Sequence, residues 1–245
     1  MQFRKYESRV EAGELLVAHI KAENYELYEN ILQSPKDYFC YAIPNGGVPV
    51  SEGFCSGFNL QYDILIVRKI KIPYNTEAGF GSVTTNGSVL INQHLLPYLN
   101  LNERDVERAI AMTRAEIKDR LEFYNKNVNL GNKYKDHIKG KSIFILDDGL
   151  ASGFTMLAAI KMILNYAPTN IFVAVPTAPL RTLKLIRNEI DNIFCPNIRE
   201  VSRFAVAEAY NHWYDIPESE VLEIINKSNF YTNTIDKKID SGKMN

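Results

Sequence analysis

The sequence lacks both an excess of charge of one sign and any long apolar run. Its 28 Lys and Arg residues nearly balance 29 Asp and Glu residues, leaving a formal charge of -1. Proteins that bind nucleic acid broadly usually carry a basic excess, so we expect no nucleic-acid partner. No apolar stretch reaches the roughly 18 residues of a membrane span, and the N-terminus has no apolar leader. These absences predict a soluble, cytoplasmic protein without a membrane partner.

Cysteine is also scarce. The three cysteines, Cys40, Cys55 and Cys195, are odd in number and far apart, which matches neither a disulfide framework nor a CxxC metal clip. Cys40 and Cys195 lie in apolar runs, so we expect them to be small buried hydrophobic residues. The chain contains no internal repeat, and its 245 residues fit one or two domains.

Short apolar runs alternate with helical patterns along most of the chain. Buried strands are predicted at 38–43, 64–67, 142–146, 171–175 and 193–195. Helices are predicted at 7–21, 102–124, 153–166, 179–188 and 217–226. Continuous apolar strands are typical of parallel sheets that are covered on both faces. The pattern therefore predicts an α/β fold with a doubly wound, mostly parallel five-stranded sheet flanked by helices.

Residues 70–100 differ from the rest, because Gly, Pro and Asn divide them into short segments. Asn86-Gly87 is a strong signal for a two-residue hairpin turn. We expect this stretch to form a small β-rich hood inserted into one domain of residues 1–228. Residues 229–245 are polar and are predicted to form a loose tail. On the helix at 102–124, Glu116 and Arg120 are four residues apart and are expected to pair on the exposed side.

The segment 144–156 is the most informative in the chain. A buried strand ends in Asp147 and Asp148, and a loop of small residues then opens a helix. Such a loop turns backbone N–H groups toward an anion, and the helix N-terminus adds its positive end. Carboxylates accept hydrogen bonds from sugar hydroxyls or hold the water shell of Mg²⁺. The segment predicts a ribose 5′-phosphate site, and it has neither a Walker A nor a dinucleotide-binding glycine pattern.

Residues 145–153, Ile-Leu-Asp-Asp-Gly-Leu-Ala-Ser-Gly, resemble the phosphoribosyl-pyrophosphate (PRPP) signature of the type I phosphoribosyltransferases. Further segments resemble elements of one group in that family, in the same order: Ser-Arg-Val-Glu-Ala-Gly at 8–13, Ala-Ile-Pro-Asn-Gly-Gly-Val-Pro-Val at 42–50, and the segments 67–69 and 174–176. The resemblance extends to about residue 223. It implies Mg²⁺-dependent transfer of a 5-phosphoribosyl group from PRPP to a nucleobase-like acceptor, with release of pyrophosphate.

The resemblance also implies roles for individual residues. The donor would be bound by the loop and the two acids: Asp147, Asp148, Gly149, Ala151, Ser152, Gly153, Phe154 and Thr155. Of these, Asp147 and Asp148 would hold the ribose hydroxyls and, through water, the metal. Asn45, Gly46 and Gly47 would form the pyrophosphate loop, and Arg68 and Lys69 would act as catalytic cations. Related folds are mostly dimeric, which implies a homo-oligomer, most simply a homodimer.

Two positions depart from the family pattern. The group has Arg where this chain has Asn45, so a positive charge on the pyrophosphate is lost unless Arg68 or Lys69 replaces it. Hypoxanthine-guanine enzymes have Asp where this chain has Ala151, which disfavours 6-oxopurine acceptors. Adenine, orotate, uracil, xanthine-like bases and a non-nucleobase amine remain open. Two other functions also remain open: a PRPP- or nucleotide-binding regulator with weak catalysis, and a phosphomonoester hydrolase with both acids as direct metal ligands.

Overall fold

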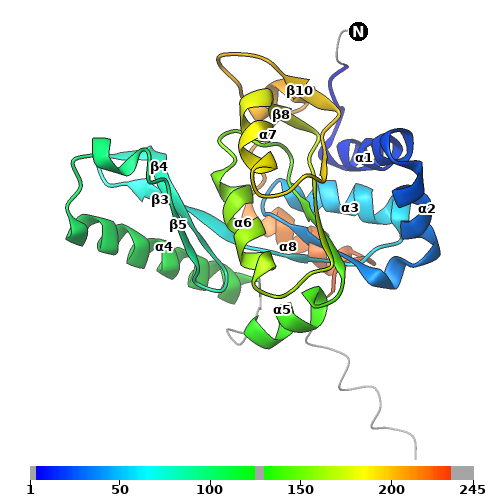
Figure 1. Ribbon diagram of the computed structural model, residues 1–245, viewed down its shortest axis with the longest axis horizontal. Coiled ribbons are helices and arrows are strands. Elements are labelled where there is room, and N and C mark those ends of the chain that lie inside the picture. Colours follow the sequence, from blue (N-terminus) through cyan, green and yellow to red (C-terminus); the bar gives the residue numbers. More distant parts are fainter. Residues whose placement is uncertain (1–3, 125–129, 233–245) are drawn as a thin grey trace, which may run out of the picture.

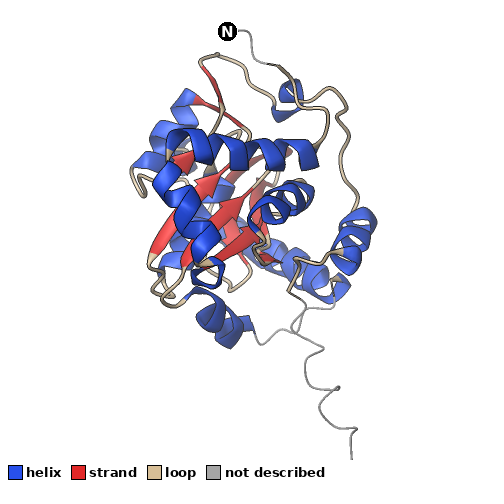
Figure 2. Ribbon diagram, turned by 90° about the vertical axis from the view of Figure 1, so that its right-hand side faces the viewer, coloured by secondary structure: helices blue, strands red, loops and turns tan. Residues whose placement is uncertain are grey.

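The computed structural model of the chain describes residues 4–124 and 130–232. At its centre lies a five-stranded parallel sheet with the strand order β2-β1-β6-β7-β9. Its strands are β1 (Tyr38–Ala42), β2 (Tyr62–Ile64), β6 (Ser142–Leu146), β7 (Asn170–Ala174) and β9 (Ile193–Phe194). The predicted fold class is therefore confirmed, and helices surround the sheet (Figures 1 and 2).

Helices lie on both faces of the sheet because the chain crosses it in two directions. From β1 the chain passes through α3 (Gly47–Phe58) to β2, and from β6 it passes through α6 (Phe154–Leu164) to β7. These steps lead toward opposite edges, so right-handed crossovers place α3 and α6 on opposite faces. The remaining helices near the sheet are α1 (Arg9–Glu23), α2 (Tyr25–Gln33), α5 (Leu130–Ile138), α7 (Leu180–Arg187) and α8 (Glu218–Lys227).

Aromatic rings from neighbouring strands stack under α3. The ring centroids of Phe144 and Phe172 are 4.7 Å apart, and those of Phe172 and Phe194 are 6.2 Å apart. Phe54 of α3 lies 5.1 Å from Phe144. Each such pair adds about 1 kcal/mol beyond the burial of its surface, so the sheet is a rigid platform for the loops at its carboxyl edge.

The hood is an antiparallel sheet of β3 (Val67–Ile72), β4 (Asn75–Thr84) and β5 (Val89–Ile91), with Gly87 in its turn at a φ of 84°. Helix α4 (Glu103–Phe123) packs along it, and together they project from the core (Figure 1). The predicted strand at 64–67 overlaps β2 only at Ile64, because β2 spans Tyr62–Ile64 and Val67 already belongs to β3 of the hood. Leu65 and Ile66 are buried at the junction, so apolar character alone does not mark where the chain leaves the sheet.

Helix α3 was not predicted, since Gly and Pro are poor helix formers. It forms against α1, where the two backbones approach closely. A Cβ on Gly13 would lie 2.0 Å from the Val50 carbonyl oxygen, and one on Gly53 would lie 2.0 Å from that of Val10. This crossing requires glycine on both helices, and it brings the start of α1 toward the loop that precedes α3.

A second small sheet pairs β8 (Thr177–Pro179) with β10 (Asn197–Arg199). Beyond it the chain returns past the carboxyl edge of the main sheet, where Tyr6 and Tyr210 form an isolated bridge. All three cysteines are buried and none forms a disulfide; burial is what we expected for Cys40 and Cys195.

The C-terminal segment is in part ordered against the sheet. The Tyr62 N–H donates to the Phe230 carbonyl oxygen over 2.9 Å, and the Thr232 N–H donates to that of Tyr62 over 2.8 Å. The expected loose tail therefore does not hold for residues 230–232, and residues 233–245 lie outside the described residues. Within the described part of the chain, no helix has the length and apolar character needed to span a membrane.

Candidate functional site

Two loops meet at the carboxyl edge of the sheet. Asp147 and Asp148 follow β6, and the predicted pyrophosphate loop follows the adjacent β1. The contact is close, since a Cβ on Gly46 would lie 1.9 Å from Asp148 Oδ2. A Cβ on Gly47 would lie 2.7 Å from the Leu146 carbonyl oxygen. The structure thus brings together the acid pair and the glycine loop, which the sequence separates by about a hundred residues.

Gly46→Ala tests this contact. The backbone of Gly46 has φ -65° and ψ -30°, which suits any residue, so only the added methyl group matters. It would displace the Asp148 carboxylate, and we expect a loss of about 2 kcal/mol in unfolding free energy, comparable to a hydrogen bond to a charged group. Thermal unfolding measures this, with Gly57→Ala as the control, because a Cβ there meets only the Val17 side chain, at 3.0 Å. Equal effects of the two substitutions would contradict the prediction.

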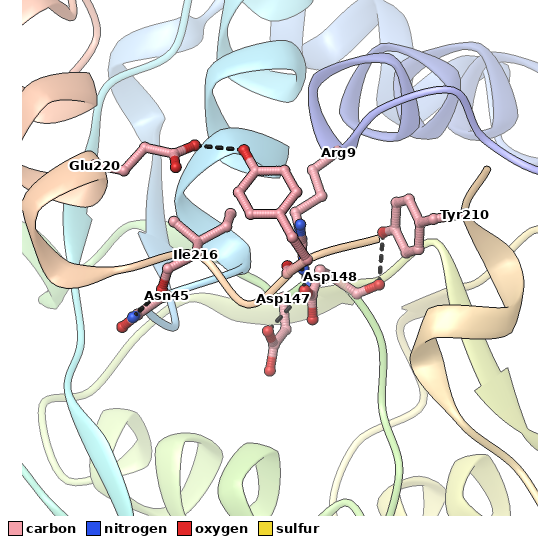
Figure 3. Close-up of polar contacts among 8 residues, drawn as sticks. Arg9, Asn45, Asp147, Asp148, Tyr210, Ile216 and Glu220 are labelled. Carbon is pink, nitrogen blue, oxygen red and sulfur yellow. Dashed lines mark hydrogen bonds and ion pairs between the residues drawn. The ribbon is translucent and has the colours of Figure 1, made fainter. Parts of the chain in front are cut away.

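Asp148 is held by a buried arginine from the first helix. Arg9 Nε donates to Asp148 Oδ2 over 2.8 Å, and the Arg9 side chain is only 6% exposed (Figure 3). On the other side the Tyr210 hydroxyl donates to the Asp148 carbonyl oxygen over 2.7 Å. Arg9 Nη2 also donates to the Tyr214 carbonyl oxygen, over 3.1 Å. The second acid is therefore fixed by groups from both ends of the chain.

Three aromatic rings surround the guanidinium of Arg9. Its central carbon lies 4.1 Å from the ring centroid of Trp213, 5.6 Å from that of Tyr210 and 5.7 Å from that of Tyr214. Ring faces attract a cation, and this partly replaces the hydration that Arg9 loses on burial. The sequence analysis assigned no role to Arg9. The available signal was its place shortly before Ala12-Gly13, two small residues that allow close packing of a helix.

The two acids differ in their tendency to ionise. Burial, followed by the neighbouring Asp148 carboxylate, raises the pKa of Asp147 well above its usual range. Burial also raises the pKa of Asp148, but the Arg9 guanidinium opposes that shift. The pKa of Asp147 is therefore raised further than that of Asp148, which is the ion-pair partner of Arg9.

The loop after the acids presents unpaired backbone donors. No carbonyl among the described residues accepts a hydrogen bond from the N–H groups of residues 151–155. Gly153, at the N-cap of α6, has a φ of 81°, and a Cβ there would lie 2.7 Å from Thr182 Cγ2. The Thr182 hydroxyl of α7 donates to the Ala151 carbonyl oxygen over 2.6 Å. This bond directs the carbonyl toward α7 and holds the loop in place. Unpaired N–H groups at a helix N-terminus are typical of a phosphate site.

The two predicted catalytic cations, Arg68 and Lys69, are neighbours on β3 of the hood. Arg68 Nη2 is 3.4 Å from Glu116 Oε2, and Lys71 Nζ is 3.2 Å from Glu116 Oε1. Lys69, the neighbour of Arg68 on β3, points to the opposite face of the strand and packs over Gly79. Arg68 and Lys69 therefore lie on opposite faces of β3, and the catalytic role of either one stays a prediction.

The expected exposed pair of Glu116 and Arg120 is wrong. Arg120 is turned inward, with its side chain 14% exposed, and its Nε lies 2.6 Å from Glu218 Oε1 of α8. Its Nη1 also donates to Asn45 Oδ1 over 3.1 Å, while Asn45 Nδ2 donates to the Ile216 carbonyl oxygen over 2.6 Å. Tertiary partners outweigh the few tenths of a kcal/mol that a local helical pair provides.

The described residues contain no cluster of three or more His, Cys, Asp or Glu side chains suited to a metal. Two adjacent carboxylates are nevertheless sufficient for Mg²⁺, which keeps several waters and usually takes its other ligands from substrate phosphates. Asp147 and Asp148 fit a metal that arrives with its substrate.

Two adjacent acids at a strand end, a loop of small residues before a helix and a glycine loop on the next strand meet at one edge of the sheet. The chain belongs to the phosphoribosyl transferase domain family, whose model matches residues 8–212. The type I phosphoribosyltransferase resemblance is confirmed at the level of the family and its fold.

Curated relatives and a solved structure agree with this assignment. Two Mycobacterium tuberculosis proteins, one from each of two strains and both named only provisionally as phosphoribosyl transferases, are 25% identical over 197 residues. The match covers 80% of this chain but 43% of theirs, so the chain spans less than half the length of these relatives. The crystal structure of TT1426 from Thermus thermophilus has a TM-score of 0.68 at 23% identity, covering 90% of this chain and 97% of that one. The likeness to TT1426 concerns the fold alone.

Proposed function

We propose that this chain transfers a 5-phosphoribosyl group from PRPP to a nucleobase-like acceptor and releases pyrophosphate. The observation that carries the proposal is the row of unpaired N–H groups at residues 151–155, directly after the half-buried acid pair. A phosphate in that loop places the sugar over Asp147 and Asp148 and its C1 substituent toward Gly46. These are the two ends of one bound PRPP molecule.

The residues act by binding and orientation. The loop neutralises the 5′-phosphate, and the acids hold the ribose hydroxyls, so the reacting C1 atom is fixed relative to the acceptor. Asp147 accepts hydrogen bonds from the ribose hydroxyls. Asp148, fixed by Arg9, acts only as an acceptor. The pair thus distinguishes a vicinal diol from other sugars.

We include Mg²⁺ in the proposal. Asp147 and Asp148 would hold it through water, together with oxygens of PRPP, and when bound it would supply positive charge to the leaving pyrophosphate. The buried carboxylates at the edge of the site are costly to ionise alone, which favours a cation nearby. We expect the metal to bind weakly without PRPP and tightly with it.

A panel of bases tests the reaction. The protein is mixed with PRPP, Mg²⁺ and one base from adenine, uracil, orotate, xanthine, hypoxanthine and guanine, and pyrophosphate release is measured. We expect release with one acceptor and none with hypoxanthine or guanine, because Ala151 lacks the carboxyl group that the usual 6-oxopurine route employs. Phosphate release from ribose 5-phosphate without a base would instead indicate a hydrolase.

A PRPP- or nucleotide-binding regulator is the second candidate. One observation favours it: Asp148 is already bound by Arg9 through its carboxylate and by Tyr210 through its carbonyl oxygen. An acid held in this way is compatible with a protein that binds PRPP without turning it over. Calorimetric binding of PRPP with Mg²⁺, together with no pyrophosphate release for any acceptor, would select this candidate. Release with any acceptor would exclude it.

We also propose that the chain forms a homodimer. The projecting hood and α4 expose Tyr74, Tyr98 and Met112, which gives an apolar surface for a second copy. Light scattering coupled to size-exclusion chromatography measures the mass; a mass of about 28 kDa, that of one chain, would contradict the dimer.

A further inference from the structure

The loop at residues 45–47 provides few free backbone donors. The Gly47 N–H donates to the Ile43 carbonyl oxygen over 3.0 Å, and the Val48 N–H donates to that of Asn45 over 3.2 Å. The next residue, Pro49, has no N–H group. Among the described residues, nothing accepts from the N–H groups of Asn45 and Gly46. An anion beside this loop therefore has two backbone donors and requires charge from elsewhere.

Arg120 reaches this loop from the hood side. Its Nη1 is 3.1 Å from Asn45 Oδ1, so a guanidinium stands where the loop itself has a neutral side chain. Three cations lie along this edge with two carboxylates between them: Arg68 and Lys71 share Glu116, and Arg120 pairs with Glu218. These five groups carry a net positive charge, which favours an anion. Burial, followed by the Arg68 guanidinium, lowers the pKa of Arg120.

Glu218 sets the orientation of Arg120. It holds Nε, the inner nitrogen of the guanidinium, at 2.6 Å, while Asn45 holds Nη1. Nη2 makes no hydrogen bond with any described residue. The guanidinium is thus held at Nε and Nη1, and the two N–H groups of Nη2 are available to a ligand. Such a fork suits phosphate oxygens.

We propose that Arg120 binds the pyrophosphate group of the donor and replaces, from helix α4, the positive charge that Asn45 lacks. The inference rests on the proposed phosphoribosyl transfer and names a catalytic residue for it. As the C1–oxygen bond breaks, its electron pair goes to the leaving pyrophosphate. A lone pair of the acceptor forms the new bond to C1, and the acceptor's proton passes to water. Arg120 stabilises the negative charge that accumulates on the leaving oxygen.

The test uses inorganic pyrophosphate with Mg²⁺ and, separately, ribose 5-phosphate as calorimetric ligands of the whole protein. For Arg120→Gln we expect pyrophosphate affinity to fall roughly tenfold to a hundredfold, as for one hydrogen bond to a charged group. Ribose 5-phosphate affinity should change less than about twofold, since Arg120 lies on the side of Asn45 and not of the phosphate loop. Lys118→Gln is the matched control, because it removes one positive charge from a 65% exposed position of the same helix.

Glu218→Gln separates binding from a merely structural ion pair. A structural role predicts that both variants of the pair weaken pyrophosphate binding alike. Direct binding by Arg120 predicts opposite signs: Arg120→Gln weakens it, and Glu218→Gln strengthens it by removing a competing carboxylate. Circular dichroism and thermal unfolding confirm that each variant is folded. Asn45→Arg added to Arg120→Gln should restore most of the lost affinity.

The outcomes are distinguishable. Unchanged pyrophosphate affinity in Arg120→Gln, or equal losses in both variants of the ion pair, would overturn the role of Arg120 and leave the proposed reaction intact. If the unmodified protein binds neither ligand, the proposed reaction itself fails, and the role of Arg120 with it.

Discussion

Asp147→Asn is expected to stabilise the ligand-free protein at neutral pH, whereas Asp148→Asn is expected to destabilise it. Burial and the adjacent carboxylate raise the pKa of Asp147, so its charged form is disfavoured in the folded protein, and an amide removes that penalty. Asp148 is 2.8 Å from Arg9. Its replacement leaves a buried guanidinium without its counter-ion, which costs about 3 kcal/mol.

The gain from Asp147→Asn depends on pH with a defined sign. An Asp carboxyl has a pKa of about 3.9 in the unfolded chain, and the folded value is higher. Between the two values the folded protein binds more protons than the unfolded chain, so its stability falls as pH rises through this window. The amide does not titrate. We therefore expect no gain at about pH 3, below the unfolded pKa, and the full gain only above the raised pKa of the folded protein.

Urea unfolding at a series of pH values measures both substitutions. Asp119→Asn on the exposed side of α4 is the control and should change the unfolding free energy by less than about 0.5 kcal/mol. Both acid substitutions should also abolish calorimetric binding of PRPP with Mg²⁺. Stability changes of the same sign for Asp147→Asn and Asp148→Asn would contradict the larger rise in pKa at Asp147 and the stabilising role of the Arg9–Asp148 ion pair.

The parts of the site that could be predicted are those contained in one stretch of sequence or joined by the sheet. The strand Ser142–Leu146, the acids and the small loop are consecutive, so their geometry follows from a strand–loop–helix rule. The loop at residues 45–47 follows another apolar strand, and parallel strands end at the same edge. No partner outside those segments is required to place them.

Arg9 and Arg120 could not be placed in this way. Arg9 is 139 positions from Asp148, and Arg120 is 75 positions from Asn45. Whether they reach the site depends on how α1 and α4 are rotated about their axes and how closely each helix approaches the sheet edge. Hydrophobic periodicity defines both quantities only roughly. For Arg120 the i, i+4 spacing to Glu116 pointed outward, whereas Glu218 and Asn45 turn the side chain inward. Long-range ion pairs therefore define the part of the site that the sequence pattern missed.

The unpredicted helix α3 has a related cause. Local propensity opposes a helix that contains Gly47, Pro49, Gly53 and Gly57, yet nearly all of its side chains are buried. Gly53 is required by the close approach of α1 and Gly47 by that of the Leu146 carbonyl oxygen, so tertiary packing outweighs propensity here. Pro49 lies in the first turn, where its missing N–H costs little, and this was the signal available for a helix.

Arg9→Met is expected to cost about 3–5 kcal/mol of unfolding free energy, because it leaves the Asp148 carboxylate buried without its partner. Removing the cation over Trp213 adds to the loss. Arg9→Lys should recover only part of it, since an ammonium cannot both stack on the ring and donate in the geometry of Nε. Arg4→Met is the control, because Arg4 is 82% exposed and 4.0 Å from Glu11, and it should be nearly neutral.

A double-mutant cycle shows whether Arg9 acts through Asp148. If the two form one unit, Arg9→Met combined with Asp148→Asn should cost less than the sum of the single changes, with a coupling of about 2 kcal/mol. Without Arg9, the pKa of Asp148 loses the largest contribution that opposes the rise caused by burial. Binding of PRPP with Mg²⁺ to Arg9→Met should therefore require a higher pH than binding to the unmodified protein. Additive stability costs together with an unshifted pH profile would show that Arg9 serves packing alone.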